Sequence, residues 1–294
     1  MDAPNPSATP TFASRTPLHI GSLALNVRDL DRMTGYYRDM LGLDVIDHRP
    51  GKAMLGAGSV GFLELDHRPD MKLDNEREAG LYHTAFLMPT RADLARWILH
   101  AARTQVPVTG ASDHTVSEAF YLDDPEGNGV EVYADRNPDG WEWTGELVKI
   151  TTDPLDIEAI VREVQPGASY DGAPGGLRIG HVHLRVGDVP SAERFYRDGI
   201  GLAVTRGGRH GASFMSSGRY HHHLAGNVWH SKGAGPRDPN RAGLSWFSFA
   251  ANDAAEVDAA RARLQSAGAP VTDIAGGFET ADPWGTRVRV VKAA

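Results

Sequence analysis

An internal repeat constrains the fold of this chain more strongly than any other feature of its sequence. Nine residues recur at a constant offset of 159 positions, without a gap. They are Leu25, Val27, Asp29, Tyr37, Arg38, Asp39, Gly42, Leu43 and Val45 in the first copy, and Leu184, Val186, Asp188, Tyr196, Arg197, Asp198, Gly201, Leu202 and Val204 in the second. Each copy begins with alternating apolar residues, the pattern of a half-buried strand. An aspartate then caps the start of a helix and a glycine ends it. The repeat therefore predicts a strand–helix–strand unit in each half of the chain.

A second repeat lies between these copies. Residues 80–86, a helix over 92–104 and Pro107–Val108 are echoed by residues 243–249, a helix over 254–266 and Pro270–Val271. Both copies lead to a D-P-x-G turn, at 124–127 and 282–285, where Pro and Gly suit a tight turn. The offset falls from 163 to 158 between these landmarks, so the earlier copy has five extra residues between Val108 and Asp124.

The two repeats together predict an α+β chain of four units, over residues 18–66, 80–136, 179–231 and 242–292. The simplest domain organisation is an N-terminal pair of modules over 18–136 and a C-terminal pair over 179–294. Between them, residues 137–178 form a connector with a helix near 156–164. Residues 1–17 are rich in Pro, Ser, Thr and Ala, which predicts a loose tail.

Composition excludes several classes of function. The net charge is −8 and the pI about 5.9, so no basic field attracts nucleic acid or anionic lipid. The chain has no cysteine, which excludes disulfides and thiolate metal sites and leaves metal chemistry to its 13 histidines and its carboxylates. No apolar run approaches the roughly 20 residues that span a bilayer, and no signal peptide pattern is present. We expect a cytoplasmic protein with no membrane or nucleic-acid partner.

Alignment of the four units indicates three candidate metal ligands. His181 lies on the first strand of the third unit, His83 on that of the second unit, and Glu131 on the last strand of the second unit. The equivalent positions in the other two units are Ser22, Trp246 and Arg289. Only a crossed pairing of residues 80–136 with 179–231 therefore assembles two histidines and one carboxylate. Pairing within each half would leave both sets incomplete.

Two histidines and one carboxylate leave open positions on a metal ion for exogenous ligands. This donor set suits Fe(II), Mn(II) or Zn(II). A single histidine on a strand is more commonly a hydrogen-bonded structural residue, but three matched positions favour a metal site. The run His221–His222–His223 has a blander interpretation as a solvated strand edge, and His183 either lines a pocket or only makes a hydrogen bond.

The segment from Asp113 to Glu131 carries a resemblance to a known family. It contains His114, the apolar–Tyr pair Phe120–Tyr121, the D-P-x-G turn and Glu131. Together with the sequences Y-H-H-H-L-A at 220–225 and N-V-W at 227–229, it resembles the vicinal oxygen chelate superfamily of glyoxalases, bleomycin resistance proteins and dioxygenases. Among these it is most similar to two-domain bacterial catechol 2,3-dioxygenases of the extradiol type.

This resemblance implies four βαβββ modules paired into two cup-shaped mixed sheets. It further implies an enzyme that opens a catechol-type ring with Fe(II) and O2, with Mn(II) as the alternative metal, and that forms a homo-oligomer. Tyr121 would hydrogen-bond the bound diol, His114 would lie near a substrate oxygen, and His222 would be the acid/base, with His221 as the alternative. Typical members take all three ligands from the C-terminal half, which Trp246 and Arg289 prevent here.

Two other functions remain open at this stage. One is a glyoxalase-type lyase or isomerase that uses another divalent metal, and the other is a metal-free binding or resistance protein with the same fold. The paired histidines beside Tyr121 favour oxygen chemistry over the first. Retention of all three ligands argues against the second. The sequence does not determine the ring substituents or the metal.

Overall fold

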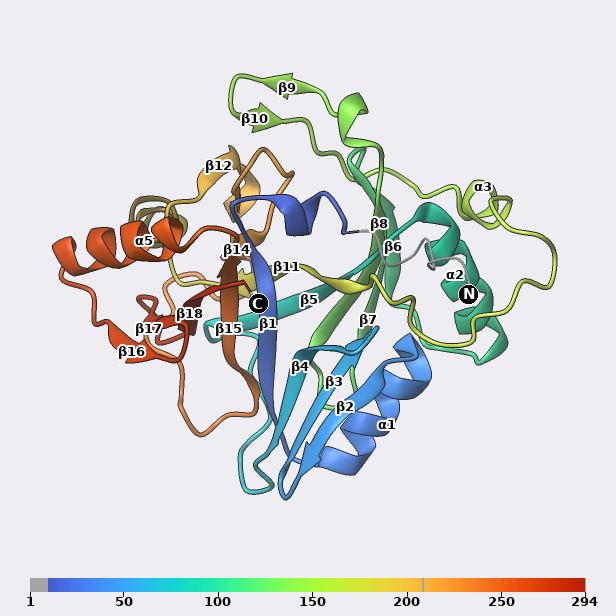
Figure 1. Ribbon diagram of the computed structural model, residues 1–294, viewed down its shortest axis with the longest axis horizontal. Coiled ribbons are helices and arrows are strands. Elements are labelled where there is room, and N and C mark those ends of the chain that lie inside the picture. Colours follow the sequence, from blue (N-terminus) through green and yellow to red (C-terminus); the bar gives the residue numbers. More distant parts are fainter. Residues whose placement is uncertain (1–9, 208, 294) are drawn as a thin grey trace.

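Two eight-stranded mixed sheets form the structure, a computed structural model that describes residues 10–207 and 209–293 (Figure 1). The strands of the first sheet are β1 (Leu18–Val27), β2 (Asp44–Arg49), β3 (Lys52–Ala57), β4 (Val60–His67), β15 (Gly243–Ala251), β16 (Thr272–Ile274), β17 (Gly277–Ala281) and β18 (Arg287–Lys292). Those of the second are β5 (Gly80–Met88), β6 (Gly110–Asp113), β7 (Ser117–Asp123), β8 (Gly129–Asp135), β11 (Arg178–Arg185), β12 (Ala203–Arg206), β13 (Ala212–Ser216) and β14 (Leu224–Asn227). The predicted α+β class with two mixed sheets is confirmed.

Each sheet combines strands from both halves of the chain. The order is β16-β17-β18-β15-β1-β4-β3-β2 in the first sheet and β12-β13-β14-β11-β5-β8-β7-β6 in the second. The halves meet where β1 pairs antiparallel with β15 and where β5 pairs antiparallel with β11. The second sheet thus joins strands of 80–136 to strands of 178–227, although domain boundaries at 18–136, 137–178 and 179–294 stay a prediction.

The repeated helices begin and end where the repeat predicts. Helix α1 (Leu30–Leu41) starts at Asp29, whose carboxylate accepts the N–H of Arg32, and ends at Gly42 with φ of 69°. Its counterpart starts at Asp188, which accepts the N–H of Ser191, and ends at Gly201 with φ of 104°. Positive φ costs glycine little, so both helices stop there. The second copy differs in continuing from α4 (Val189–Glu193) into a π-helical segment, η4 (Arg194–Ile200).

The remaining elements cover the sheets and link the halves. The long helices are α2 (Arg91–Arg103) and α5 (Ala254–Ser266), which agree with the predicted spans to within one residue. The connector contains a short helix, α3 (Ile157–Val161), and the hairpin β9 (Trp143–Thr144) and β10 (Leu147–Val148), which projects at the top of Figure 1. The short 3-10 helices are η2 (Ala13–Arg15), η3 (Pro138–Gly140) and η5 (Arg209–Gly211). None of the described helices combines the length and apolar character needed to cross a bilayer.

The aspartates of the two D-P-x-G turns have a structural role. Asp124 accepts backbone N–H groups of its own turn and the hydroxyl of Tyr37 at 2.9 Å. Asp282 is held in the same way, with Tyr196 donating at 2.9 Å. Burial raises the pKa of Asp282 to about 6. Each tyrosine–aspartate hydrogen bond links a repeated helix to the next unit in the same half of the chain. The sheets, in contrast, link units from different halves.

The loose tail predicted for residues 1–17 is wrong for the part that precedes β1. Residues 1–9 lie outside the described residues, but Ala13 and Thr16 are buried against the second sheet. The Thr16 hydroxyl lies within hydrogen-bonding distance of the carbonyl oxygens of Ala13 and Leu18, at 2.8 and 2.9 Å. The polar composition of this segment suggested a loose tail. In the structure, local hydrogen bonds satisfy its polar groups, so the segment can pack.

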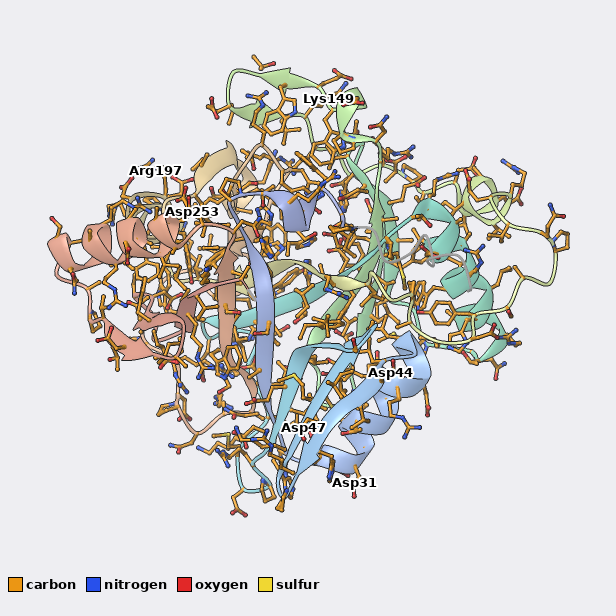
Figure 2. All side chains as sticks on the ribbon, viewed as in Figure 1. Asp31, Asp44, Asp47, Lys149, Arg197 and Asp253 are labelled. Carbon is orange, nitrogen blue, oxygen red and sulfur yellow. The ribbon has the colours of Figure 1, made fainter. Side chains whose placement is uncertain are left out.

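Charged side chains mark the exposed edge of the first sheet. Strand β2 is exposed along its whole length, and Figure 2 labels Asp44 and Asp47 on it. Charges on an edge strand discourage pairing with another chain. The apolar core instead lies where the two sheets and their helices pack together, around residues such as Phe62, Phe86 and Phe247.

Candidate metal centre

Three side chains from neighbouring strands converge at the centre of the second sheet. The Nε2 of His83 lies 3.0 Å from the Oε2 of Glu131, and the Nε2 of His181 lies 3.2 Å from the same oxygen. The two Nε2 atoms are 3.3 Å apart. All three residues are buried, and their ligand atoms form a group that could hold a metal ion.

Strand order and register bring these residues together. Strand β5 lies between β11 and β8, and Ala85 of β5 is opposite His181 on one side and Glu131 on the other. His83 is two residues before Ala85, so its side chain points to the same face. The small side chain of Ala85 leaves room between the ligands. A register shift between Ile179 and His181 skips Gly180.

Gly180 is required by close packing behind the metal centre. A Cβ atom at this position would lie 1.9 Å from the hydroxyl oxygen of Tyr133. That tyrosine packs against His181, with ring centroids 5.0 Å apart, and its hydroxyl lies 2.8 Å from that of Tyr220. The absence of a Cβ atom at Gly180 therefore leaves room for the tyrosine that packs against the His181 ring.

The spacing and protonation of the three groups fit a divalent metal. Ligand atoms about 2.1 Å from a metal are separated by roughly 3.0 Å at right angles and roughly 3.4 Å at tetrahedral angles. Burial opposes ionisation of Glu131, but His181 and His83 outweigh it and hold the pKa of this carboxyl well below its usual range. Burial lowers the pKa of His181 to about 4. At neutral pH the group thus offers a carboxylate and a neutral imidazole, the forms that bind metals.

At the equivalent positions of the first sheet, the side chains bond one another. The guanidinium of Arg289 lies 3.7 Å from the ring centroid of Trp246 and donates to Glu279 at 2.8 Å. Ser22 is hydrogen-bonded to Ser248 instead of facing a ligand set. Among the described residues, the grouping of two histidines and one carboxylate that could hold a metal lies in the second sheet.

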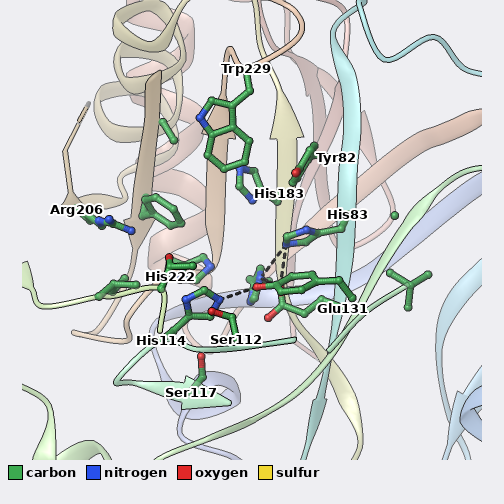
Figure 3. A pocket seen from close by; sticks show the side chains of 18 of the residues that line it. Tyr82, His83, Ser112, His114, Ser117, Glu131, His183, Arg206, His222 and Trp229 are labelled. Carbon is green, nitrogen blue, oxygen red and sulfur yellow. Dashed lines mark hydrogen bonds and ion pairs between the residues drawn. The ribbon is translucent and has the colours of Figure 1, made fainter. Parts of the chain in front are cut away.

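A cavity of about 560 Å³ opens beside the metal centre. His83, Glu131 and His181 line it together with His114, Tyr121 and His222. Figure 3 labels four of these residues, His83, Glu131, His114 and His222. The connector also contributes, through Ile150 and Thr152. All six residues predicted for the site therefore border one cavity, which is of a size typical for small-molecule sites.

His114 and Tyr121 form a hydrogen-bonded pair at this cavity. The Nδ1 of His114 lies 2.7 Å from the carbonyl oxygen of Thr151, which can only accept, so Nδ1 carries the proton. When Nδ1 carries the only proton of the ring, Nε2 accepts from the Tyr121 hydroxyl, 2.6 Å away. Burial raises the pKa of Tyr121 well above its usual value, so the phenol stays protonated.

His222 is the member of the histidine run that faces the cavity. His221 is fully buried, with its Nε2 2.8 Å from Asp135, and His223 bonds Ser216 and the segment before β1. Burial lowers the pKa of His222 well below its usual range. The alternative of a solvated strand edge is therefore wrong for these histidines, because all three are buried.

A chain of hydrogen bonds links His222 to Asp135 through His221. The Asp135 carboxylate accepts from the Nε2–H of His221, so the Nδ1 of a neutral His221 is an acceptor. The Nδ1 of His222 lies 2.8 Å away, and in a pair of neutral rings it donates to this acceptor. In neutral His222 this leaves Nε2 with a lone pair, and no described group is bonded to it.

Several residues that border the cavity were not predicted. Tyr82 and Trp229 pack edge to face, with ring centroids 5.3 Å apart. His183 contacts both rings and accepts from Asn227 at 3.0 Å. Both suggested roles of His183 are therefore present. The other unpredicted lining residues include Arg206, His210 and Phe214. Asp135 could have been suspected, since it lies four residues after Glu131 on one strand face; no local signal identifies the rest.

Comparisons with known proteins agree with this architecture. The family described as the Glyoxalase/Bleomycin resistance protein/Dioxygenase superfamily matches residues 19–132 and 178–290. The chain is 35% identical over 274 residues to a catechol-2,3-dioxygenase of Bacillus subtilis, a match that covers 90% of this chain and 94% of that protein. It is 29% identical over 177 residues to a biphenyl-2,3-diol 1,2-dioxygenase of Rhodococcus globerulus, covering 56% of this chain and 93% of that protein.

Solved structures with low sequence identity share the fold. A Bacillus subtilis protein provisionally named a dioxygenase matches with a TM-score of 0.63 and 14% identity, covering 97% of this chain and 86% of that one. Glyoxalase I from Zea mays matches with a TM-score of 0.57 and 16% identity, covering 96% of this chain and 94% of that one.

Loss of a candidate ligand should prevent metal retention. We expect Glu131→Ala, Glu131→Gln and His181→Ala to weaken binding by more than the roughly 10–100-fold that loss of an outer partner costs. The measurement is metal content after anaerobic loading with Fe(II) and desalting, with circular dichroism to verify folding. His210→Ala, which changes a cavity histidine outside the triad, is the control and should retain metal. Unchanged metal content in folded Glu131 or His181 variants would contradict the assignment.

Proposed function

The chain belongs to the glyoxalase/bleomycin resistance protein/dioxygenase superfamily, and we propose that within it the chain is an extradiol ring-cleavage dioxygenase. Its substrates would be a catechol-type aromatic diol and O2, and its metal Fe(II). His83, Glu131 and His181 would hold that metal. His222, Tyr121 and His114 would act on the diol.

One observation carries this proposal more than any other. The three candidate ligand atoms lie within 3.3 Å of one another at the wall of a cavity that also presents His222 and Tyr121. A site that only bound a ligand would not need a metal triad beside a histidine with an available lone pair. The named catechol-2,3-dioxygenase and biphenyl-2,3-diol dioxygenase relatives support the same chemistry.

The proposed mechanism assigns proton transfers to His222. Bound Fe(II) would lower the pKa of the diol oxygens and bring diol and O2 together. The Nε2 of His222 would take a proton from a diol hydroxyl, because it has a free lone pair and the ring is neutral at pH 7. The Nδ1–H of the same ring stays directed at His221, so Asp135 and His221 hold the ring while Nε2 reacts. The proton on Nε2 is then available to a leaving oxygen when the ring opens.

Tyr121 and the aromatic residues would complete the site. The Tyr121 hydroxyl can turn from His114 towards a substrate oxygen and donate to the negative charge that develops there. His114 retains its orientation through Thr151. On the far side, Tyr82, His183 and Trp229 present ring surfaces that would exclude water from a bound aromatic ring.

Ring cleavage can be tested directly with reconstituted protein. After anaerobic loading with Fe(II), addition of O2 and catechol should consume O2 and produce a yellow ring-opened product. The expected signature is one O2 consumed per catechol, measured with an oxygen electrode and by absorbance. Metal-dependent isomerisation of a thiohemiacetal without O2 uptake would favour a glyoxalase-type function. Catechol binding that is indifferent to metal, without turnover, would favour a binding protein.

Replacement of His222 should slow the reaction without removing the metal. We expect His222→Gln to retain Fe(II) but to lower kcat by about 10²–10⁴-fold, the usual contribution of a general acid or base. His230→Gln, on an exposed turn, is the matched control. Metal content and kcat should be measured on the same preparations. Normal turnover by His222→Gln would transfer the acid/base role to another group.

Asp135 should matter through the orientation of His222. We expect Asp135→Ala to lower kcat by about 10–100-fold, as loss of an outer partner commonly does, with little change in KM. Asp135→Asn should recover part of the rate, because an amide oxygen can still accept from His221. Tyr220→Phe removes the other hydrogen bond to Asp135, at 3.1 Å, and serves as the control. Equal rates for Asp135→Ala and the wild type would contradict this role.

A further inference from the structure

The cavity contains a positive charge that the proposed ring chemistry does not use. Arg206 is the last residue of β12, it is half-buried, and it lines the cavity. Its guanidinium carbon lies 5.3 Å from the ring centroid of Phe214, so it stacks on that ring. Burial lowers the pKa of Arg206, and no neighbouring carboxylate raises it. An arginine nevertheless remains charged at neutral pH.

Arg206 has no acidic or hydrogen-bonding partner among the described residues. The other described arginines that are not exposed have partners. For example, Arg178 donates to three carbonyl oxygens, and Arg185 and Arg237 both pair with Asp74. The described arginines without partners, such as Arg38 and Arg103, are exposed to water. A half-buried guanidinium has lost part of its hydration, which is costly unless another group replaces it. Arg206 is therefore ready to receive an anion.

The position of Arg206 is far enough from the metal centre to meet a substituent on the ring. Phe214 and His222 separate it from the triad, with centroid distances of 5.0 Å from Phe214 to His222 and 4.1 Å from His222 to His181. Figure 3 shows Arg206 on the opposite side of the pocket from His83 and Glu131. A diol held at the triad would thus direct its distal ring edge towards Arg206.

The negative charges of the cavity lie elsewhere. Glu131 belongs to the triad, and Asp123, the other acidic residue that lines the cavity, lies beside Tyr36 and Tyr82. No described carboxylate is close enough to Arg206 to compete with a ligand. The cavity therefore has a metal-binding end and a separate cationic end.

We propose that Arg206 is a specificity residue that binds a carboxylate on the substrate, so that the preferred diols are catechols bearing a ring carboxylate or a short carboxylate arm. This proposal rests on the proposed function for the reaction itself. A guanidinium offers paired N–H donors that match the two oxygens of a carboxylate. A cavity of about 560 Å³ leaves room beyond a single ring for such a group.

Matched substrates and variants test this proposal. 4-Methylcatechol and 3,4-dihydroxyphenylacetate differ by one carboxylate at the same ring position, and 3,4-dihydroxybenzoate places the carboxylate directly on the ring. We expect Arg206→Met to lower kcat/KM for at least one carboxylated diol by about 10–100-fold, as loss of a charged hydrogen bond does. The value for 4-methylcatechol should stay within about twofold, since no charged contact is lost. Arg206→Lys should recover part of the loss.

Arg219→Met is the matched control. Arg219 is also stacked on an aromatic ring, 4.4 Å from the centroid of Trp143, but it lies on an exposed surface outside this cavity. It reproduces the change in net charge without touching the site. The substrate preference of this variant should equal that of the wild type.

Anaerobic calorimetry separates failure of this proposal from failure of the proposed function. Dissociation constants of the same diols should show the same dependence on Arg206 without any turnover. If the dissociation constants depend on Arg206 but no ring is cleaved, the dioxygenase function is contradicted and the anion site is supported. Cleavage of catechol with equal losses for neutral and carboxylated diols in Arg206→Met, or no loss for either carboxylated diol, would overturn the anion site.

Discussion

The burial of the Glu131 carboxylate is the constraint on which the architecture of the second sheet depends. A buried charge without compensation is strongly destabilising. His83 and His181 lie within hydrogen-bonding distance of it, at 3.0 and 3.2 Å, and they come from different halves of the chain. The contact therefore requires β11 to lie next to β5, with Ala85 small enough to let all three side chains meet. The same pairing of β5 with β11 therefore joins the two halves of the chain and brings the three side chains together.

The first sheet has the same architecture without the three candidate ligands, and a different charge is compensated there. Arg289 replaces the carboxylate with a cation, and it is compensated by Glu279 and by the face of Trp246. The side chains that occupy this region leave no comparable ligand set among the described residues. This sheet keeps the helix caps, the turn aspartates and the strand order of its counterpart. The repeat thus preserves the helix caps, the turns and the strand order in both sheets. The candidate ligand set depends on a few side chains on one face of the second sheet.

Features with a local cause could be predicted from the sequence, whereas features made by distant contacts could not. The caps at Asp29 and Asp188 and the glycines at 42 and 201 act within one turn of helix, so their pattern was readable. The triad became readable because the repeat supplied an alignment of strands. Asp135 and Arg206 needed the fold, because their partners or neighbours come from segments remote in sequence. The packing of Ala13 and Thr16 and the π-helical turns after Glu193 also had no local signal.

The two halves contribute different groups to one cavity, which connects ligand binding with the crossed fold. Residues 80–136 supply Glu131, Tyr121 and His114, and residues 178–231 supply His181 and His222. A metal or substrate that contacts both sets binds the folded chain and not the unfolded one, so it stabilises the crossed pairing by mass action. The orientation of His222 also spans the halves, because its partner His221 bonds Asp135 of β8. The proposed recognition and proton transfer would therefore depend on the same few strands that join the two halves.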